Sequence, residues 1–477
     1  MQIKDPSTRP ATAGTGTLVL DDIVALARQL QGRIVLPDDP DFAEARSVHF
    51  VSDAMPALIV RAATAADVAA TVRFVRERHL ELAVRSGGHS LALFSTLDGG
   101  VVLDLSAMKT LEVDVATRIA RLGAGLTWGE VAAALHPHGL GLSSGDNGTV
   151  GVGGLATGGG IGWFARKYGL TVDHIRAIEV VTAEGQVITA TASEHPDLFW
   201  AIRGGGGNFG IATMFEVELH PAGMVYGGAI FYDASEAASV LPAFARYAAS
   251  APDELTAMAL VLAAPPAPFI PPDVQGKPVV ALALIYSGNF DEGSRVVDPL
   301  RKLGTPVADI VGPMPYPAIF QFTEDASPLN LRLHARSVMV DAADDALISA
   351  LLDAGATDVP SAGALFQIRI LGGAMARGDA QSSAAFAQRD REALVLAVVY
   401  GYDAADAGRH EAWVERLYET MHPFATGAYV GFLMRDEQER IHEVYPPATL
   451  ARLRQVKRRY DSTNFFRHNL NIEPDEE

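Results

Sequence analysis

The chain has 477 residues, of which 49% are hydrophobic and 20% charged, a composition that excludes a mainly disordered protein. Its 57 acidic residues outnumber its 38 Lys and Arg residues and leave a formal charge of −19. So acidic a surface repels phosphate backbones, and we expect no nucleic acid as a partner. The chain has no cysteine, which excludes disulfides, thiolate-bound metals and cysteine nucleophiles.

The hydropathy of the chain favours a cytoplasmic protein. Residues 1–16 are polar and rich in Pro, Thr and Gly, and they lack the apolar run of a signal peptide. No stretch of 18 apolar residues is free of charge, so we expect no membrane partner. The absence of cysteine fits a reducing compartment.

A small β-α-β unit is predicted near the N-terminus. Residues 57–61 favour a strand, and residues 64–79 favour a helix that Thr64 can cap together with Asp67. Residues 80–84 favour a second strand, which opens into a turn that reads RSGGHS, residues 85–90.

A glycine-rich segment follows further along the chain. Residues 143–162 contain nine glycines, a density that predicts a loop or bulged backbone close to a ligand rather than a helix or strand. Around this segment the pattern predicts strands at 101–105, 119–122, 175–182, 186–190 and 211–219, and helices at 127–136 and 196–202.

The middle of the chain has longer strands interleaved with helices. The expected strands are 226–232, 257–262, 279–286 and 394–400, and the expected helices are 235–249, 292–303 and 344–354. This alternation favours an antiparallel sheet with helices on one face. A basic helix from about residue 450 leads to a segment that begins YDSTN at residue 460.

Two glycine motifs, at residues 151–156 and 205–210, match the consensus sequence of a dinucleotide-binding loop. A Rossmann site needs a strand before the motif and a helix after it, and neither motif has that context. Glycine clusters also bring backbone N–H groups against phosphates or a flat ring. Three such clusters therefore favour a large ligand touching the backbone at several places, with simple tight turns as the alternative.

Four motifs in one order carry a resemblance to a known family: RSGGHS, TVGVGGLATGGGIGWFARKYGL, DLFWAIRGGGGNFGIAT and YDSTNFFRHNLNI. The chain resembles the berberine-bridge-enzyme-like FAD oxidases, which belong to the vanillyl-alcohol-oxidase-type flavoproteins. The resemblance is dense over residues 33–221 and 429–474. It implies a two-domain α+β fold, with an FAD-binding domain at 1–222, a substrate domain at 223–449, and a segment at 450–477 that returns to the FAD-binding domain.

The resemblance also implies where FAD binds. His89 holds the position of a histidine that is bonded to the 8-methyl carbon of the flavin. Many relatives have a second bond from a cysteine where this chain has Asn147, so a single bond through His89 is expected. The cofactor-binding residues implied are Arg85, Ser86, Gly87, Gly88, His89, Ser90, Asn147, Thr149, Val150, Gly153, Gly154, Gly158, Gly159, Gly210, Ile211 and Asn469.

The resemblance assigns the chemistry less fully. Val150 matches a position that controls access of O2 to the flavin, and its modest size favours an oxidase. Relatives often carry two tyrosines three residues apart, one of them a base, where this chain has Tyr429 and Phe432. A phenol with a pKa near 10 must be made more acidic to act as a base. The other polar candidates are His334 and Gln367, with Arg336 and Arg369, and we expect Gln367, Arg369 and Tyr429 to lie in strands.

The implied function is an FAD-dependent oxidase. It would take a hydride from a small alcohol, amine or phenolic, polyketide-like compound to flavin N5, and O2 would reoxidise the flavin with release of H2O2. No metal is expected. The alternatives are a flavin-dependent dehydrogenase or oxygenase, or a flavoprotein that sequesters a drug-like compound.

Overall fold

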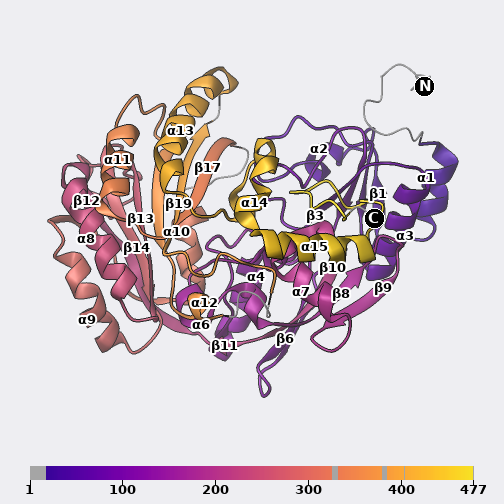
Figure 1. The fold of residues 1–477 in the computed structure, drawn as a ribbon, viewed down its shortest axis with the longest axis horizontal. Coiled ribbons are helices and arrows are strands. Elements are labelled where there is room, and N and C mark those ends of the chain that lie inside the picture. Colours follow the sequence, from indigo (N-terminus) through magenta and orange to yellow (C-terminus); the bar gives the residue numbers. More distant parts are fainter. Residues whose placement is uncertain (1–17, 325–330, 379–383, 402, 476–477) are drawn as a thin grey trace.

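A computed structural model describes residues 18–324, 331–378, 384–401 and 403–475 (Figure 1). The first of its sheets has the strand order β1-β2-β4-β3. It consists of β1 (Arg33–Val35), β2 (Leu58–Arg61), β3 (Leu82–Arg85) and β4 (Val101–Asp104). Strands β2 and β3 both run parallel to β4, which lies between them. The predicted β-α-β unit is therefore confirmed.

Helix α3 (Ala65–Glu77) connects β2 to β3 and begins where the sequence predicted. The Asp67 backbone N–H donates to the Thr64 hydroxyl at 3.2 Å, and the Asp67 carboxylate accepts from the Thr64 N–H at 3.3 Å. This reciprocal cap satisfies two backbone donors that a helix otherwise leaves without partners.

A second, antiparallel sheet has the strand order β5-β6-β10-β8-β9. Its strands are β5 (Leu111–Asp114), β6 (Ile119–Gly123), β8 (Ile175–Val181), β9 (Val187–Thr191) and β10 (Ile211–Glu218). The helices near it are α4 (Trp128–Leu135) and α7 (Pro196–Gly205). Two short strands, β7 (Leu140–Gly141) and β11 (His220–Pro221), form a separate antiparallel pair.

The glycine-rich segment 143–162 contains a helix, and the expectation of loop alone was wrong there. Helix α5 (Val152–Gly158) buries Val152 and Ala156, which are 0% and 1% exposed. It packs against α7. Tertiary burial outweighs the poor helix propensity of glycine at this point.

The glycines at the start of α5 allow a very close approach of two loops. A β-carbon on Gly87 would lie 2.2 Å from the Gly151 nitrogen, and one on Gly151 would lie 2.1 Å from the Gly87 nitrogen. The Ser86 hydroxyl adds to the contact, since it donates to Ala124 O at 2.6 Å and accepts from Gly153 N at 3.2 Å. The RSGGHS turn is thereby fixed against the N-terminus of α5.

The large sheet has eight strands, all paired antiparallel, in the order β15-β12-β14-β13-β18-β19-β17, with β16 beside β12. They are β12 (Met224–Asp233), β13 (Leu255–Ala263), β14 (Pro278–Tyr286), β15 (Pro306–Asp309), β16 (Gly312–Pro315), β17 (Arg332–Val340), β18 (Ala364–Ile370) and β19 (Ala393–Gly401). The antiparallel sheet was predicted, and Gln367 and Arg369 were expected in a strand, which is β18, but β15, β16 and β17 were not among the strands named from the sequence.

Helices cover one face of this sheet, as predicted (Figure 1). They are α8 (Ala237–Ser250), α9 (Phe290–Arg301), α11 (Asp345–Gly355) and α13 (Ala407–Met421). Their apolar side chains form one core with alternate strand residues such as Val338, Phe366 and Val395. The residues between these, on the opposite side of each strand, are left to face the rest of the molecule.

Shorter helices occupy the connections, and the last long helix leads back to the first part of the chain. The short ones are α1 (Leu20–Ala27), α2 (Phe42–Ala45), α6 (Ala165–Tyr168), α10 (Gln321–Glu324), α12 (Ala374–Arg377) and α14 (Ile441–Val444). Helix α15 (Pro447–Tyr460) packs against α7. The domain boundaries given above stay a prediction.

Lys457 of α15 fixes this returning segment. Its side chain is fully buried, and its ammonium donates to Asp461 at 2.7 Å, to Asn208 O at 2.8 Å and to Phe466 O at 2.9 Å. One cation thus joins the helix, the glycine loop after α7 and the C-terminal segment. Three acceptors match the three donors of an ammonium group.

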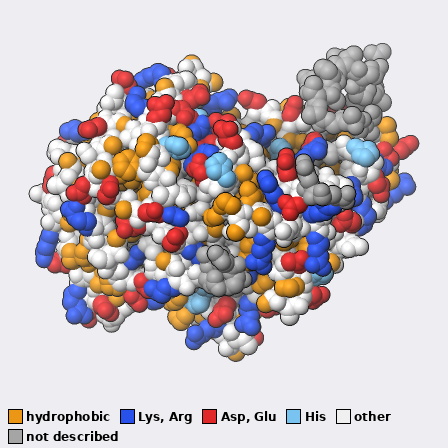
Figure 2. Space-filling view, viewed as in Figure 1, with side chains coloured by type: hydrophobic (Ala, Val, Ile, Leu, Met, Phe, Trp, Pro, Cys, Tyr) orange, Lys and Arg blue, Asp and Glu red, His pale blue; other side chains and the backbone are white. Residues whose placement is uncertain are grey.

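Charged side chains of both signs are interspersed over the face shown in Figure 2. Many form exposed pairs, such as Arg246 with Asp345 at 2.6 Å and Arg76 with Glu184 at 3.0 Å. Exposed pairs of this kind contribute little stability each. Within the described ranges, no helix is both long and apolar enough to cross a membrane.

Lys457→Met should lower the free energy of unfolding by about 3–5 kcal/mol, because it leaves the Asp461 carboxylate buried without its cation. Denaturant unfolding of the purified holoprotein measures the change. Lys302→Met, which removes an exposed pair with Asp298, should cost less than about 1 kcal/mol. Equal losses in the two variants would contradict the role given to Lys457.

Gly151→Ala should disrupt the contact between the two glycine loops, because its methyl group would meet the Gly87 backbone. We expect lower stability and loss of bound flavin, measured by unfolding and by flavin absorbance per protein. Gly408→Ala is the control, since Gly408 is exposed in α13 with nothing within 4 Å of an added β-carbon. That change should stabilise the protein by about 0.5–1 kcal/mol. A flavin-replete Gly151→Ala protein of normal stability would refute the prediction.

Candidate active site

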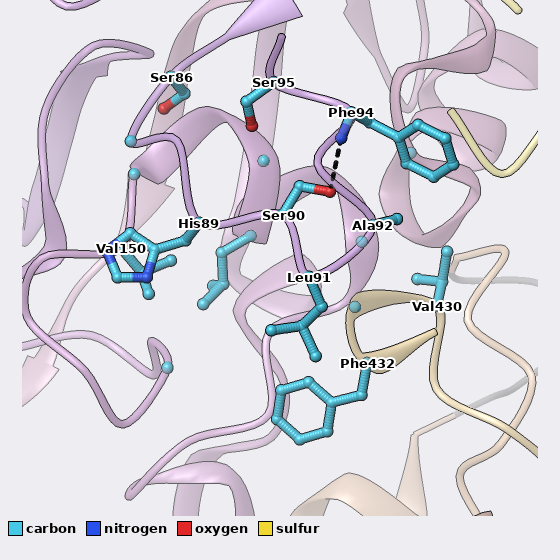
Figure 3. A pocket seen from close by; sticks show the side chains of 18 of the residues that line it. Ser86, His89, Ser90, Leu91, Ala92, Phe94, Ser95, Val150, Val430 and Phe432 are labelled. Atoms are coloured by element: carbon cyan, nitrogen blue, oxygen red, sulfur yellow. Dashed lines mark hydrogen bonds between the residues drawn. The ribbon is translucent and has the colours of Figure 1, made fainter. Parts of the chain in front are cut away.

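A cavity of about 450 Å³ lies between the glycine loops and the helix-free face of the large sheet. One side is lined by the turn after β3, by α5 and by the loop after α7, and the other by β13, β17, β18 and β19. Figure 3 shows the turn from Ser86 to Ser95 passing along the cavity, with Phe432 beside Leu91. Segments far apart in the sequence thus form one site.

His89 and Val150 lie next to each other at the edge of this cavity (Figure 3). The Nε2 atom of His89 is 2.8 Å from the Thr149 hydroxyl, and the His49 ring stacks on the His89 ring with centroids 3.7 Å apart. Burial, with a smaller effect of His49, lowers the pKa of His89 to about 3. The imidazole is therefore neutral at pH 7 and keeps a lone pair for bond formation.

The glycine loops present bare backbone to the cavity. Gly154, Gly206 and Gly207 line it, and a β-carbon on any of them would meet nothing within 4 Å. The Oδ1 atom of Asn469, another lining residue, is buried and has no hydrogen-bond partner among the described residues. Open backbone and an unused acceptor fit a large ligand such as FAD, with a flat ring and phosphates.

Most of the predicted cofactor-binding residues line the cavity. They are Ser86, Gly87, Gly88, His89, Ser90, Asn147, Val150, Gly153, Gly154, Gly158, Gly210, Ile211 and Asn469.

Three predicted cofactor residues lie outside the lining. Arg85 points away, because its guanidinium pairs with Asp104 at 2.9 Å and donates to Ser47 O at 3.1 Å. Gly159 faces the Phe386 ring, 2.6 Å from where a β-carbon would stand. Thr149 reaches the site only through its contact with His89. The resemblance predicted that these three residues contact the cofactor, but none of them lines the cavity.

The wall opposite the glycine loops is mainly apolar. Alternate residues of four strands contribute Leu260, Ala335, Leu365, Leu396 and Val398. The same strands contribute two polar side chains, Gln367 and Tyr400. Gln367 lies in a strand, as predicted, and is 6% exposed.

His334 does not reach the cavity, and its candidacy as a catalytic residue was wrong. It alternates in β17 with the cavity residue Ala335, so its side chain faces the helices, where Nε2 lies 3.0 Å from Glu415 of α13. Arg336 lies on the same side and pairs with Glu415 at 2.7 Å and Asp436 at 2.6 Å. A shift of one position along a strand reverses the face.

Tyr429 lines the cavity. It was expected to lie in a strand, and that expectation was wrong. It precedes a single 3-10 turn (Val430–Phe432), and its ring contacts Phe432 with centroids 5.3 Å apart. Its oxygen accepts from Gly160 N at 3.3 Å. Burial raises the pKa of Tyr429 despite that hydrogen bond, so the phenol is a poor base in this setting.

Several cavity residues were missed from the sequence. Asp146 lines the cavity and pairs with Arg369, a strand residue that is 2% exposed. Thr323, also in the lining, donates from its hydroxyl to Asp146 O. Asp146 directly precedes Asn147, so its position beside a ligand residue was the available signal.

Arg435 was also missed, and it joins the loop of Tyr429 to the turn of His89. Its guanidinium donates to Ala92 O and to Leu93 O, each at 3.2 Å. No sequence pattern indicated this contact, since the two segments are more than 300 residues apart. The Arg435 side chain thus links the segment after Tyr429 to the turn that follows His89.

Comparisons with known proteins show which family the chain resembles. A model of an FAD binding domain matches residues 56–191, and a berberine and berberine-like model matches residues 428–473. The (R)-6-hydroxynicotine oxidase of Paenarthrobacter nicotinovorans is 33% identical over 470 residues, 95% of this chain and 99% of that protein. An FAD-linked oxidoreductase of Dictyostelium discoideum is 31% identical over 422 residues, 88% of this chain and 89% of its own length.

Solved structures share the fold along nearly the whole chain. The 6-hydroxy-D-nicotine oxidase of Arthrobacter nicotinovorans superposes with a TM-score of 0.83 at 29% identity, covering 94% of this chain and 98% of its own. Berberine-bridge-enzyme-like 1 of Physcomitrella patens superposes with a TM-score of 0.85 at 22% identity, covering 95% and 99%. With its glycine-lined cavity and these relatives, the chain belongs to the berberine-bridge-enzyme-like family of FAD-dependent oxidoreductases.

Proposed function

We propose that this protein is an oxidase of a small, largely apolar amine. The observation that carries the proposal is the apolar wall formed by Leu260, Leu365, Leu396 and Val398 opposite the glycine loops. A carbohydrate would bring many hydroxyl groups to this wall, and each one buried without a partner costs about 1–3 kcal/mol. An apolar ring or chain with one polar group fits the wall, with Gln367 available to that group.

The state of Tyr429 favours an amine over an alcohol. Hydride loss from an alcohol requires removal of the hydroxyl proton, and burial makes the Tyr429 phenolate costly. A neutral amine can release a hydride without a protein base, because its nitrogen lone pair stabilises the cation that forms. The name of the Paenarthrobacter relative, which refers to an amine, supports the same choice.

The cofactor would be held as the motifs imply. Bound FAD would supply the hydride acceptor at N5, and O2 would be the final acceptor of the two electrons, with H2O2 as the product. His89 would bind it covalently, since the imidazole is neutral and lines the cavity. Without cysteine, Asn147 cannot add a second bond of the kind seen in doubly linked relatives. The Gly206 and Gly207 backbone would approach the ligand directly.

A substrate panel tests the proposal. Cyclic amines should bleach the flavin under anaerobic conditions, and in air they should consume O2 and release an equal amount of H2O2. For glucose and chitooligosaccharides we expect kcat/KM to be at least about a hundredfold lower, because several hydroxyls would lack partners. Reduction without O2 uptake would indicate a dehydrogenase, and tight one-to-one binding without reduction would indicate a sequestering protein. Faster reduction by sugars would refute the proposal.

Tyr429→Phe separates amine from alcohol chemistry. With an amine, the rate of flavin reduction should stay within about threefold, the effect of one hydrogen bond. With an alcohol that relies on the phenol, the rate should fall by roughly 10²–10⁴. Stopped-flow absorbance measures both. Tyr247→Phe is the matched control, because that hydroxyl donates to Val296 O in the helical layer, away from the cavity. A loss above a hundredfold with the amine would overturn the assignment.

Val150→Ile tests the proposed access of O2. The added methylene should slow reoxidation of the reduced flavin by a larger factor than it slows reduction by substrate. Both half-reactions can be timed separately by stopped flow. Val187→Ile, at an exposed position in β9, serves as the control and should alter neither. Equal effects on the two half-reactions would remove Val150 from control of O2 access.

A further inference from the structure

Asp146 gives the cavity its charge. Of the described residues that line the cavity, Asp146 alone is acidic, and none is Lys or Arg. His89 and His468 also line it, but burial lowers the pKa of both, to about 3 for His89, so neither carries a positive charge at pH 7. The described surface of the cavity is therefore anionic at one place and otherwise neutral.

A cation from the opposite wall holds Asp146. The Oδ2 atom of Asp146 pairs with the guanidinium of Arg369, which leaves β18 on the same face as the cavity residue Gln367. The Arg369 side chain is 3% exposed, whereas the Asp146 side chain is 20% exposed. The pair thus keeps its cation covered and presents its carboxylate to the cavity.

One carboxylate oxygen of Asp146 is left without a partner. The contact with Arg369 uses Oδ2, and no hydrogen bond reaches Oδ1 from the described residues. Thr323 contacts only the backbone, since its hydroxyl donates to Asp146 O. An ionised carboxylate can accept several hydrogen bonds, and a single contact with Arg uses part of that capacity. The Oδ1 atom is therefore available to a ligand.

The surface around this acceptor is apolar. Leu260 of β13 pairs with Gln367 in the sheet, two positions from Arg369 along β18. Leu260 and Phe322 line the cavity and pack against the same hydrophobic cluster. A charge interaction is stronger where apolar groups exclude water. A ligand with a cationic N–H group for Asp146 and carbon atoms for Leu260 and Phe322 would match both surfaces.

We infer that Asp146 binds the ammonium group of the substrate and makes the site selective for cations. The inference rests on the proposed oxidation of an amine and names the residue that recognises it. A small aliphatic amine is protonated at pH 7, because its pKa is close to that of lysine, about 10.4. Its N–H donates to Oδ1, while Arg369 stays on Oδ2. An alcohol of the same shape gains no charge interaction, and a carboxylate is repelled.

Arg369 also explains how the empty site stays stable. A carboxylate alone in an apolar wall is costly, because it loses its water without gaining a counter-charge. Arg369 supplies that charge and donates to Ile161 O at 3.5 Å, which holds it against the glycine-rich segment. The same guanidinium reduces the attraction of Asp146 for a second cation. We therefore expect a moderate preference for amines.

The bound ammonium must lose a proton before hydride can leave, since only the neutral amine has a free lone pair. This N–H proton passes to solvent water, and the nitrogen keeps its substituents. A primary or secondary amine still has an N–H for Oδ1 after this step. Asp146 can therefore hold the same nitrogen before and after deprotonation.

Ligands that cannot be oxidised separate binding from the reaction. 1-Methylcyclohexylamine has no hydrogen on the carbon that bears nitrogen, so that carbon cannot release a hydride. Its neutral and anionic counterparts are 1-methylcyclohexanol and 1-methylcyclohexanecarboxylate. Perturbation of the flavin absorbance of the holoprotein at pH 7 gives the Kd of each. The amine should bind at least about tenfold more tightly than the alcohol, and the carboxylate should bind most weakly. Binding of the carboxylate as tightly as the amine would overturn the inference.

Asp146→Asn removes the charge and keeps an acceptor for Arg369. It should weaken binding of the amine by about 10–100-fold, the effect of losing a hydrogen bond to a charged group. The Kd of the alcohol should change by less than about threefold, the effect of a weak neutral contact. Asp146→Glu keeps the carboxylate and should keep the order of the three ligands. Unchanged amine affinity in Asp146→Asn would refute the assignment. If that variant is unstable, the ligand order in the wild-type protein still decides.

Asp173 provides a matched control. It pairs with Arg389, and the side chains of the two are 20% and 1% exposed, nearly the values of the Asp146 pair. Asp173 does not line the cavity. Asp173→Asn should therefore leave all three Kd values unchanged. An equal loss of amine affinity in both variants would contradict the inference, because it would show a general effect of removing an acidic residue.

This inference and the proposed oxidase fail on different results. If oxidisable amines reduce the flavin while Asp146→Asn binds 1-methylcyclohexylamine as tightly as the wild-type protein, the oxidase stands and the role of Asp146 falls. If the amine binds through Asp146 and no amine reduces the flavin, the cation site stands and the oxidase falls.

Discussion

The contact between Gly87 and Gly151 is the constraint on which the site depends. Two loops from different parts of the chain touch through their backbones, and a β-carbon on Gly87 or Gly151 would lie 2.2 or 2.1 Å from the backbone nitrogen of the other glycine. This contact places His89 beside Val150 and sets the N-terminus of α5 against the RSGGHS turn. Without it, the hydrogen bond between His89 and Thr149 would lose its geometry.

The opposite wall depends on the two-residue period of β-strands. In β17, β18 and β19, one set of side chains forms the core with α11 and α13, and the other set faces the cavity. The same strands therefore contribute to the hydrophobic core with one face and to the cavity wall with the other. An apolar cavity wall is compatible with that arrangement, and it restricts the substrates that the flavin can meet.

The cofactor side of the site was predictable to a large extent. Its motifs are local, so the family resemblance pointed to Ser86, His89, Val150 and Gly153, which all line the cavity. Where the prediction of cavity-lining residues failed on this side, the position in the chain was close to the cavity but the side chain points away from it. Arg85 belongs to the same motif as His89, yet it turns to Asp104 because a buried guanidinium needs a partner charge.

The substrate side was harder to predict, because its residues come from distant strands. His334 and Ala335 are neighbours in sequence, and only the registration of β17 against β19 decides which of them faces the cavity. Helix α5 was missed because glycine has a low helix propensity, and burial of Val152 and Ala156 outweighs it. Arg435 and its contacts with Ala92 and Leu93 could not be inferred from any local pattern.

By itself, the sequence determined the class of fold and, through its family motifs, the FAD cofactor, because each of those motifs lies within a short stretch of the chain. Only the tertiary structure decided the hydrogen-bond partner of His89, the environment of Tyr429 and the apolar character of the cavity wall. These properties depend on burial and on hydrogen bonds between segments that are distant along the chain. The pKa of a side chain depends on its burial and on the charges and hydrogen bonds around it, and a local sequence pattern does not reveal which distant segments supply them.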